Sequence, residues 1–244
     1  MSYYIVIREK RDNDSPALSE VVRNAYYSNV YNSWLNALFH EITFQLMILV
    51  SALLFICFGI PLVYCFVSIP AVLISLYVMI YGTVSMKAAQ VLYDKKPLAC
   101  WVAEAYQPYF FIKNPGNCWY KIVTEEDIER EGIKKEGFQR KIIGTVAVMR
   151  HKQKEDWAWL FRLAVDQRYR RKGVGLKLIN VVQNWCKNNR FNNIELVMSE
   201  CQEGARELFD AAGFEMKQLY HKKLFTSAVT LQMFQLGCEV RSTF

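Results

Sequence analysis

Charged residues are missing from one long stretch of the sequence: the 45 residues from 42 to 86 contain no Asp, Glu, Lys or Arg. A bilayer core about 30 Å thick needs roughly 20 helical residues to cross it, so the stretch is too long for one span and suits two. Gly59 and Pro61 near its middle predict a break. We therefore expect two apolar helices, over residues 42–58 and 62–84, that form a transmembrane hairpin.

A hairpin returns the chain to the side from which it came, so residues 1–41 and 87–244 can belong to one domain that the membrane segment 42–86 interrupts. Three alternatives stay open: a single tilted span, a re-entrant helix that does not cross, and a hairpin buried in a core that the remaining chain is too short to cover well. A signal peptide is not expected, because the stretch begins late and lacks a small-residue cleavage site. Lysines flank its downstream end and favour cytosolic flanks, namely Lys87, Lys95 and Lys96.

Paired cysteine spacing and clustered histidines are also absent. The seven cysteines, an odd number, show neither a metal-binding nor a disulfide spacing, and the three histidines are scattered. No metal cofactor is therefore expected. The net charge of +7 permits an anionic partner. The sequence contains no recognised nucleic-acid-binding module, however, and its positive charge is tied to one turn, so nucleic acid is not the expected partner.

Strand and helix patterns alternate in the rest of the chain and predict a mixed α/β sheet. Strand patterns occur at residues 3–8, 99–105, 141–150, 157–165, 193–198, 214–221 and 228–234, and helical patterns at 17–39, 173–189 and 202–212. Prolines, glycines and charges interrupt the alternation over residues 106–140. This segment is expected to be a long insertion with a short acidic helix at 125–131.

The clearest chemical signal lies in the segment LAVDQRYRRKGVGLKLI, residues 163–179. A strand ends there, and a basic turn precedes a helix that Gly173 and Gly175 open. The exposed N–H groups and the dipole at a helix N-terminus bind anions, and glycines let a phosphate approach closely. The three-glycine dinucleotide fingerprint and the P-loop signature are both absent. The turn therefore predicts a pyrophosphate site whose basic residues are Arg170, Arg171 and Lys172.

The pattern R-x-x-G-x-G, formed by Arg170, Gly173 and Gly175, resembles the acetyl-coenzyme A motif of the GNAT acetyltransferase superfamily. Further downstream, CQEGARELFDAAGFEM resembles the closing helix and turn of that superfamily. A hydrophobic segment between the first helix and the second strand is similar to the membrane-bound, camello-like branch. That branch includes cysteine-S-conjugate, aspartate and endoplasmic-reticulum lysine N-acetyltransferases.

This resemblance implies a GNAT-type mixed sheet flanked by helices, held at the endoplasmic reticulum membrane by two spans with its GNAT domain in the cytosol. It implies acetyl-coenzyme A as cosubstrate and direct transfer of the acetyl group to a primary amine, which could be an amino acid, a cysteine conjugate or a lysine. The implied cofactor-binding residues are Leu163, Val165, Arg170, Arg171, Lys172, Gly173, Val174 and Gly175.

A direct transfer needs a base that receives the proton of the amine. Glu104, Glu195 and Glu200 are the candidates because they lie near the ends of expected strands, and the alternative for each is a solvated surface carboxylate. Arg162 lies inside the strand that precedes the motif. It either binds a carboxylate of the substrate or points to solvent.

Two departures from the family pattern leave an alternative function open. Members usually have a short loop where this chain has its insertion at 106–140, and many have a tyrosine in the closing helix, thought to protonate the leaving thiolate, where this chain has Phe209. Because phenylalanine has no proton to give, the alternative is a catalytically weak or inactive GNAT-fold membrane protein that serves as a binding or interaction module. A channel or transporter subunit is not expected, since the two spans contain no charged residue.

Overall fold

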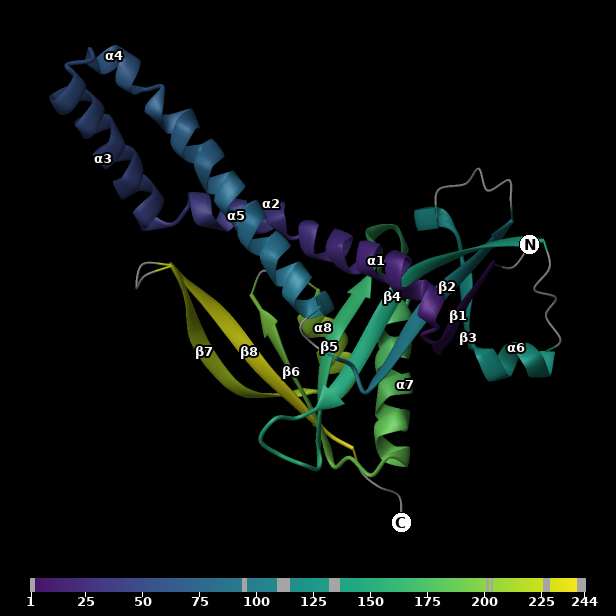
Figure 1. Ribbon diagram of the computed structural model, residues 1–244. Helices are drawn as coiled ribbons and strands as arrows, with labels where there is room; N and C mark the ends of the chain where they lie inside the picture. Colours follow the sequence, from purple (N-terminus) through teal and green to yellow (C-terminus); the bar gives the residue numbers. More distant parts are fainter. Residues whose placement is uncertain are drawn as a thin grey trace.

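The computed structural model describes residues 3–93, 96–108, 115–131, 137–200, 202, 204–225 and 229–240. Within these ranges the chain forms an eight-stranded mixed sheet in the order β3-β1-β2-β4-β5-β6-β8-β7, from which a helical hairpin projects (Figure 1). The strands are β1 (Tyr3–Glu9), β2 (Ala99–Pro108), β3 (Tyr120–Thr124), β4 (Phe138–Arg150), β5 (Trp157–Val165), β6 (Asn193–Ser199), β7 (Glu215–Phe225) and β8 (Val229–Glu239). The mixed α/β sheet that the sequence predicts is confirmed.

The helices are η1 (Asp12–Asp14), α1 (Ser15–Tyr27), α2 (Val30–Leu38), α3 (Glu41–Phe58), α4 (Leu62–Cys65), α5 (Ser68–Tyr93), η2 (Pro115–Asn117), α6 (Glu125–Glu131), η3 (Gln167–Tyr169), α7 (Val174–Asn188) and α8 (Ala205–Ala211). The single helix expected over 17–39 is therefore two helices, α1 and α2. The acidic helix expected at 125–131 is confirmed as α6.

Two helices cover the two faces of the sheet because each has one apolar stripe. In α7, Val174, Leu178 and Val182 recur at helical spacing and are buried in the main core cluster. In α1, Leu18 and Val22 do the same against the opposite face. The end of β5, which carries the motif region, therefore lies between two packed layers.

The two long apolar helices of the hairpin, α3 and α5, are joined at the expected break. Gly59 ends α3 in the left-handed region with φ +62°, a conformation that favours glycine. The two helices contact each other through the Ser51 and Ser68 hydroxyls, whose oxygens are 2.8 Å apart. Helix α2 packs on α5, where Trp34 Nε1 donates to the Leu73 carbonyl at 3.3 Å. By length and composition both helices suit a membrane span.

Strand β1 precedes the hairpin in the sequence, yet it pairs antiparallel with β2, which follows the hairpin. The pairing runs over six residue pairs, from Tyr4–Tyr106 to Glu9–Trp101. The chain thus leaves the sheet after β1, passes through α1–α5 and returns to the neighbouring strand.

The insertion differs from the expectation at both ends and in its content. Tyr106 belongs to β2 and residues 138–140 belong to β4, so the segment between these strands is shorter than 106–140. It contains β3, which the sequence patterns did not reveal and which pairs parallel with β1. Residues 109–114 and 132–136 of the expected insertion lie outside the described residues.

Candidate active site

Strands β5 and β6 separate from each other part-way along their length. Their parallel pairing covers only the pairs Trp157–Asn193, Ala158–Ile194 and Trp159–Glu195. Beyond that point β5 stays paired with β4 up to Val165, and β6 stays paired with β8 up to Ser199. The facing edges of the two strands therefore carry backbone N–H and C=O groups that can bind a ligand.

A β-bulge lies in β5 beside this opening. The register between β4 and β5 shifts between Thr145 and Ala147, so that Arg162 and Leu163 both oppose Val146. Arg162 adopts φ +59°, in the left-handed region that non-glycine residues rarely enter. The bulge turns the end of β5, with Leu163 and Val165, relative to the rest of the sheet.

The turn after β5 leads directly to the N-terminus of α7. Gly173 holds φ +80° there and is the residue before the helix. The Lys177 N–H donates to the Gly173 carbonyl, as the first bond of the helix, so the N–H groups of residues 174–176 point out of its first turn. Free N–H groups and a helix dipole of this kind bind anions in proteins, and binding of a pyrophosphate at this turn stays a prediction.

The second glycine of the motif has a different role. A Cβ added at Gly175 would lie 3.0 Å from Leu208 Cδ2 of α8. Glycine at this position therefore lets α8 pack closely on the first turn of α7.

The three basic residues of the turn each contact a different part of the molecule. Arg170 donates to the Val165 carbonyl and to Ser28 Oγ between α1 and α2, at 3.2 and 2.8 Å. Lys172 Nζ donates to the carbonyls of Gly116 and Cys118 in the insertion, at 3.0 and 2.7 Å.

Arg171 pairs with Glu207 of α8 at 2.8 Å. Both side chains of this pair are largely exposed, and exposed pairs of this kind are weak. The pair therefore holds Arg171 only weakly.

Tyr169 holds the same turn in place through its contacts with β2 and β3. It is buried, its hydroxyl accepts a hydrogen bond from the side-chain amide of Gln107, and its ring packs against Tyr120 of β3 with centroids 5.6 Å apart. Burial raises the pKa of Tyr169 to about 12. The hydroxyl therefore stays protonated, and the turn is fixed to both β2 and the insertion.

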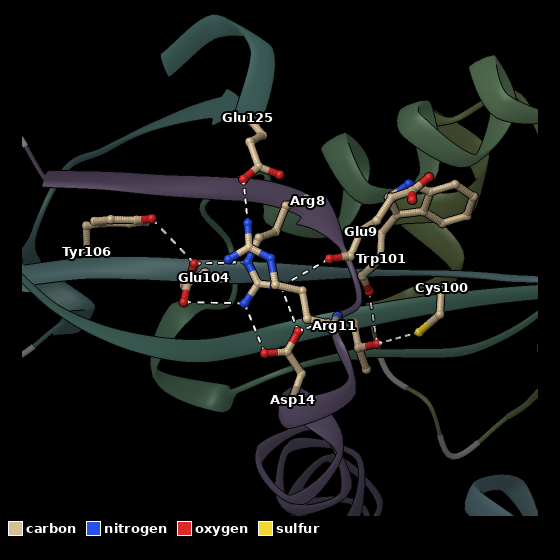
Figure 2. A network of polar contacts seen from close by, with 10 residues as sticks. Arg8, Glu9, Arg11, Asp14, Cys100, Trp101, Glu104, Tyr106 and Glu125 are labelled. Atoms are coloured by element: carbon tan, nitrogen blue, oxygen red, sulfur yellow. Dashed lines mark hydrogen bonds and ion pairs between the residues drawn. The ribbon is translucent and has the colours of Figure 1, made fainter. Parts of the chain in front are cut away.

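Glu104 belongs to a buried ionic network (Figure 2). Arg8 donates to Asp14 Oδ2 at 2.6 Å and to Glu104 Oε2 at 3.1 Å, and all three side chains are buried. The hydrogen bond from Arg8 lowers the pKa of Asp14, and the same bond raises that of Arg8. Glu104 lies on β2, which β4 separates from β5, so two strand spacings of about 4.8 Å each lie between it and the edge of the opening.

Glu195 lies in the last residue pair before β5 and β6 separate. Its neighbours Ile194 and Leu196 face the core under α7, so its own side chain points to the opposite face. Glu195 is 3% exposed and has His151 Nε2 at 3.3 Å and Lys154 Nζ at 3.7 Å. The Gln153 N–H donates to His151 Nδ1 at 3.2 Å, which leaves Nε2 to carry the proton towards Glu195.

Glu200, the third carboxylate that the sequence suggests, follows the end of β6 and is exposed. Its Oε1 accepts a long hydrogen bond of 3.5 Å from the Gln232 N–H. The structure thus separates the three candidates: Glu104 lies in an ionic network, Glu195 at the opening and Glu200 on the surface.

The model of the acetyltransferase (GNAT) family matches residues 88–214. The chain belongs to the GNAT family. It is therefore an acetyl-coenzyme A-dependent N-acetyltransferase by family, and the enzyme class that the motifs indicate is confirmed.

Curated relatives share parts of the sequence. N-acetylaspartate synthetase from Xenopus tropicalis is 22% identical over 202 residues, which cover 82% of this chain and 67% of that protein. N-acetyltransferase 8B from Mus musculus is 30% identical over 78 residues, covering 32% of this chain and 34% of that protein. The similarity to both is distant, and the second spans only about a third of the relative.

Two GNAT crystal structures are similar over nearly the whole chain. A GNAT acetyltransferase from Staphylococcus aureus Mu50 has a TM-score of 0.47 and 15% identity, with 97% of this chain and 99% of that chain covered. One from Desulfovibrio desulfuricans has a TM-score of 0.48 and 10% identity with the same coverage.

The GNAT motif region also contains Arg162, whose side chain does not point to solvent. It is 9% exposed, and its Nη2 donates to the carbonyls of Val91 and Leu92 at 2.7 and 3.2 Å. Both carbonyls belong to the last turn of α5. Binding of a substrate carboxylate by Arg162 stays a prediction.

Phe209, at the position where many GNAT enzymes have tyrosine, is buried in α8. Its ring packs edge-to-face on Phe214, with centroids 5.5 Å apart. This side chain is a core residue of the GNAT fold and offers no proton. Among the described residues, no group of three or more His, Cys, Asp or Glu side chains could hold a metal ion.

His151 and Lys154 are the site residues that sequence reasoning missed. Both lie in or near the turn between β4 and β5, over 40 positions before Glu195 in the sequence. A pairing of this kind depends on strand order, so no local pattern could have revealed it.

Proposed function

We propose that this chain is a membrane-anchored enzyme that transfers the acetyl group of acetyl-coenzyme A directly to a primary amine. The observation that carries the proposal is the separation of β5 and β6 after the pair Trp159–Glu195, beside the N-terminus of α7. A cosubstrate whose phosphates bind at the helix N-terminus can reach the opening between the strands with its thioester.

The cosubstrate would be held mainly by the motif turn. The backbone N–H groups of residues 174–176 and the side chains of Arg170, Arg171 and Lys172 would bind the pyrophosphate. The edge of β5 at Leu163 and Val165 would hydrogen-bond the acetylated arm, and a backbone N–H there would polarise the thioester carbonyl.

In the chemical step the amine nitrogen attacks the thioester carbonyl carbon, a C–N bond forms, the C–S bond breaks and coenzyme A leaves as a thiolate. The nitrogen loses one proton in this step, and Glu195 is the base that we assign. Its position at the opening between the two strands supports the assignment. With Phe209 in α8, the thiolate would take its proton from water.

The membrane part of the proposal concerns residues 42–86. The large apolar side chains of α3 and α5 are mostly exposed, which a bilayer would cover. Residues 1–41 and 87–244 would form the GNAT domain, which Lys87 and Lys96 would place on the cytosolic side. The distant similarity to N-acetylaspartate synthetase and N-acetyltransferase 8B supports the camello-like branch. The endoplasmic reticulum membrane is what the resemblance to that branch implies.

The acceptor class is an amino acid, a cysteine conjugate or a lysine. The segment between β2 and β4 contacts the motif turn, since Lys172 Nζ donates to the Cys118 carbonyl and Tyr169 packs against Tyr120. Residues of this segment would therefore help to shape the site. The test is an acetyl-transfer assay by mass spectrometry on detergent-purified protein, with aspartate, an S-substituted cysteine and a lysine peptide as acceptors. We expect one N-acetyl product.

Three glutamate-to-glutamine variants test the assignment of the base. Glu195→Gln should lower kcat by about 100-fold, the size expected for loss of a general base, whereas Glu104→Gln and Glu200→Gln should not. Glu126→Gln, an exposed position on α6, is the matched control. An unchanged kcat in Glu195→Gln would contradict the assignment. Binding of acetyl-coenzyme A without transfer to any amine would favour the interaction module instead.

A further inference from the structure

Arg162 occupies an unusual position for a charged residue. It lies inside β5, it is 9% exposed, and its backbone is in the left-handed region with φ +59°. Non-glycine residues in this region are under conformational strain, which persists only where the surroundings hold the residue in place. Such strain is concentrated at functional sites, so the contacts that hold Arg162 are informative.

The contacts come from the end of α5, the second long apolar helix. Nη2 of Arg162 donates to the carbonyls of Val91 and Leu92, which belong to the last turn of α5. Carbonyls in the last turn of a helix have no partner within the helix, and the negative end of the helix dipole attracts a cation. The guanidinium therefore caps the C-terminus of the 26-residue helix α5.

The backbone of Arg162 is part of the bulge that bends β5. Arg162 and Leu163 form the bulge opposite Val146, and Val165 ends the strand only three positions after Arg162. Leu92 also packs against the buried cluster that contains Ala164 of β5 and Leu18 of α1. The last turn of α5 and the bulged end of β5 are thus connected by a hydrogen-bonded side chain and by apolar packing.

We propose that Arg162 is a positioning residue that couples the apolar helix α5 to the acetyl-transfer strand. By capping α5 it holds the bulge, and the bulge aims the backbone of residues 163–165 at the opening between β5 and β6. The inference rests on the proposed function, because residues 163–165 are assigned there to the thioester. Arg162 itself makes no contact with substrate in this scheme.

Two variants at this position test the coupling. Arg162→Met keeps an apolar stem of similar reach and removes the donors, while Arg162→Lys keeps a cation that can still donate to one carbonyl. Arg150→Met, at the exposed end of the neighbouring strand β4, is the matched control.

In steady-state kinetics we expect Arg162→Met to lower kcat by about tenfold or more, because the bulge positions the groups that stabilise the transition state. The Kd of acetyl-coenzyme A should stay within about threefold of the parent, because the motif turn binds the phosphates. Arg162→Lys should recover part of the lost kcat. A residue with a merely structural role would lower the thermal stability and leave the kcat of the folded enzyme unchanged, and that result would overturn the proposal.

Hydrogen exchange gives a second readout that does not depend on activity. In Arg162→Met the amides of residues 163–165 and of the last turn of α5 should exchange faster together, and in Arg150→Met neither should. This readout decides the coupling even if the parent protein transfers no acetyl group, so failure of the proposed function remains distinguishable. Unchanged exchange at residues 163–165 in Arg162→Met would overturn the proposal.

Discussion

The apolar side chains of α7, which packs on the sheet, are buried, whereas those of α3 in the hairpin are largely exposed. Leu178, Ile179 and Val182 of α7 are fully buried against the sheet. On α3, by contrast, Ile48 is 71% and Ile56 76% exposed. Helix α7 has one apolar stripe, whereas α3 is apolar all round, the pattern of a helix whose surroundings are apolar on every side. The apolar side chains of α7 are therefore covered by the sheet of the same chain, whereas the described residues do not cover those of α3.

The largest effect should come from breaking the buried ionic network of the sheet. Arg8→Met leaves the carboxylates of Asp14 and Glu104 buried without their cation, which should lower the free energy of unfolding by about 3–5 kcal/mol at neutral pH. Arg11→Met, which loses only a more exposed pair with Glu125, should lower it by less than about 1 kcal/mol. Urea unfolding followed by fluorescence measures both, and equal losses would contradict the role of the network.

Acid should act on the same network. Since the pKa of Asp14 is lower in the folded state than its ordinary value of 3.8, the pair with Arg8 stabilises the fold at pH values above 3.8. This stabilisation is lost as the pH falls through the lowered pKa. The parent should therefore lose stability on acidification below about pH 5 more steeply than Arg8→Met does. Parallel pH profiles of the two proteins would count against this account.

A charge placed on the hairpin should disturb membrane attachment and leave the sheet intact. Leu49 lies in the middle of α3 and is 56% exposed, and an arginine at a helix centre costs about 2.5–3.5 kcal/mol on insertion scales. Leu49→Arg should therefore reduce the share of protein that stays with membranes after alkaline extraction. Leu219→Arg on β7, where the leucine is 47% exposed, is the matched control and should extract like the parent. Equal extraction of both variants would argue against a bilayer around α3.

The smallest effect should come from an exposed aromatic outside the hairpin. Trp119, in the insertion, is 94% exposed. Trp119→Ala should change the free energy of unfolding by less than about 0.5 kcal/mol and should leave membrane attachment unchanged. Reduced attachment in this variant would extend the membrane-contacting surface beyond the hairpin.

Local sequence patterns were sufficient for the elements that carry their own signal. Three such elements each depend on a short stretch of sequence: the apolar spacing of α7, the Gly59–Pro61 break and the basic turn before Gly173. Helices and turns of this kind depend on neighbours in the sequence, so the sequence predicted them.

Partners that lie far apart in the sequence could not be predicted in the same way. In the sequence Glu104 could not be distinguished from a surface carboxylate, because its partner Arg8 on β1 lies 96 positions away. Arg162 meets the end of α5 across 71 positions. The five-residue strand β3 pairs with β1, which lies 117 positions earlier in the sequence at the pair Tyr3–Tyr120. These contacts depend on strand order, which no short pattern encodes.

The most direct test of the central claim is calorimetric titration of acetyl-coenzyme A into the detergent-purified chain and two glycine variants. Gly173→Trp and Gly213→Trp impose the same strain, since both glycines have φ +80° and are exposed, but only Gly173 lies at the N-terminus of α7. The account predicts micromolar binding by the parent and by Gly213→Trp, and a loss of about 100-fold or more in Gly173→Trp, where the indole blocks the anion site. Equal affinity in all three proteins, or no binding by the folded parent, would contradict it.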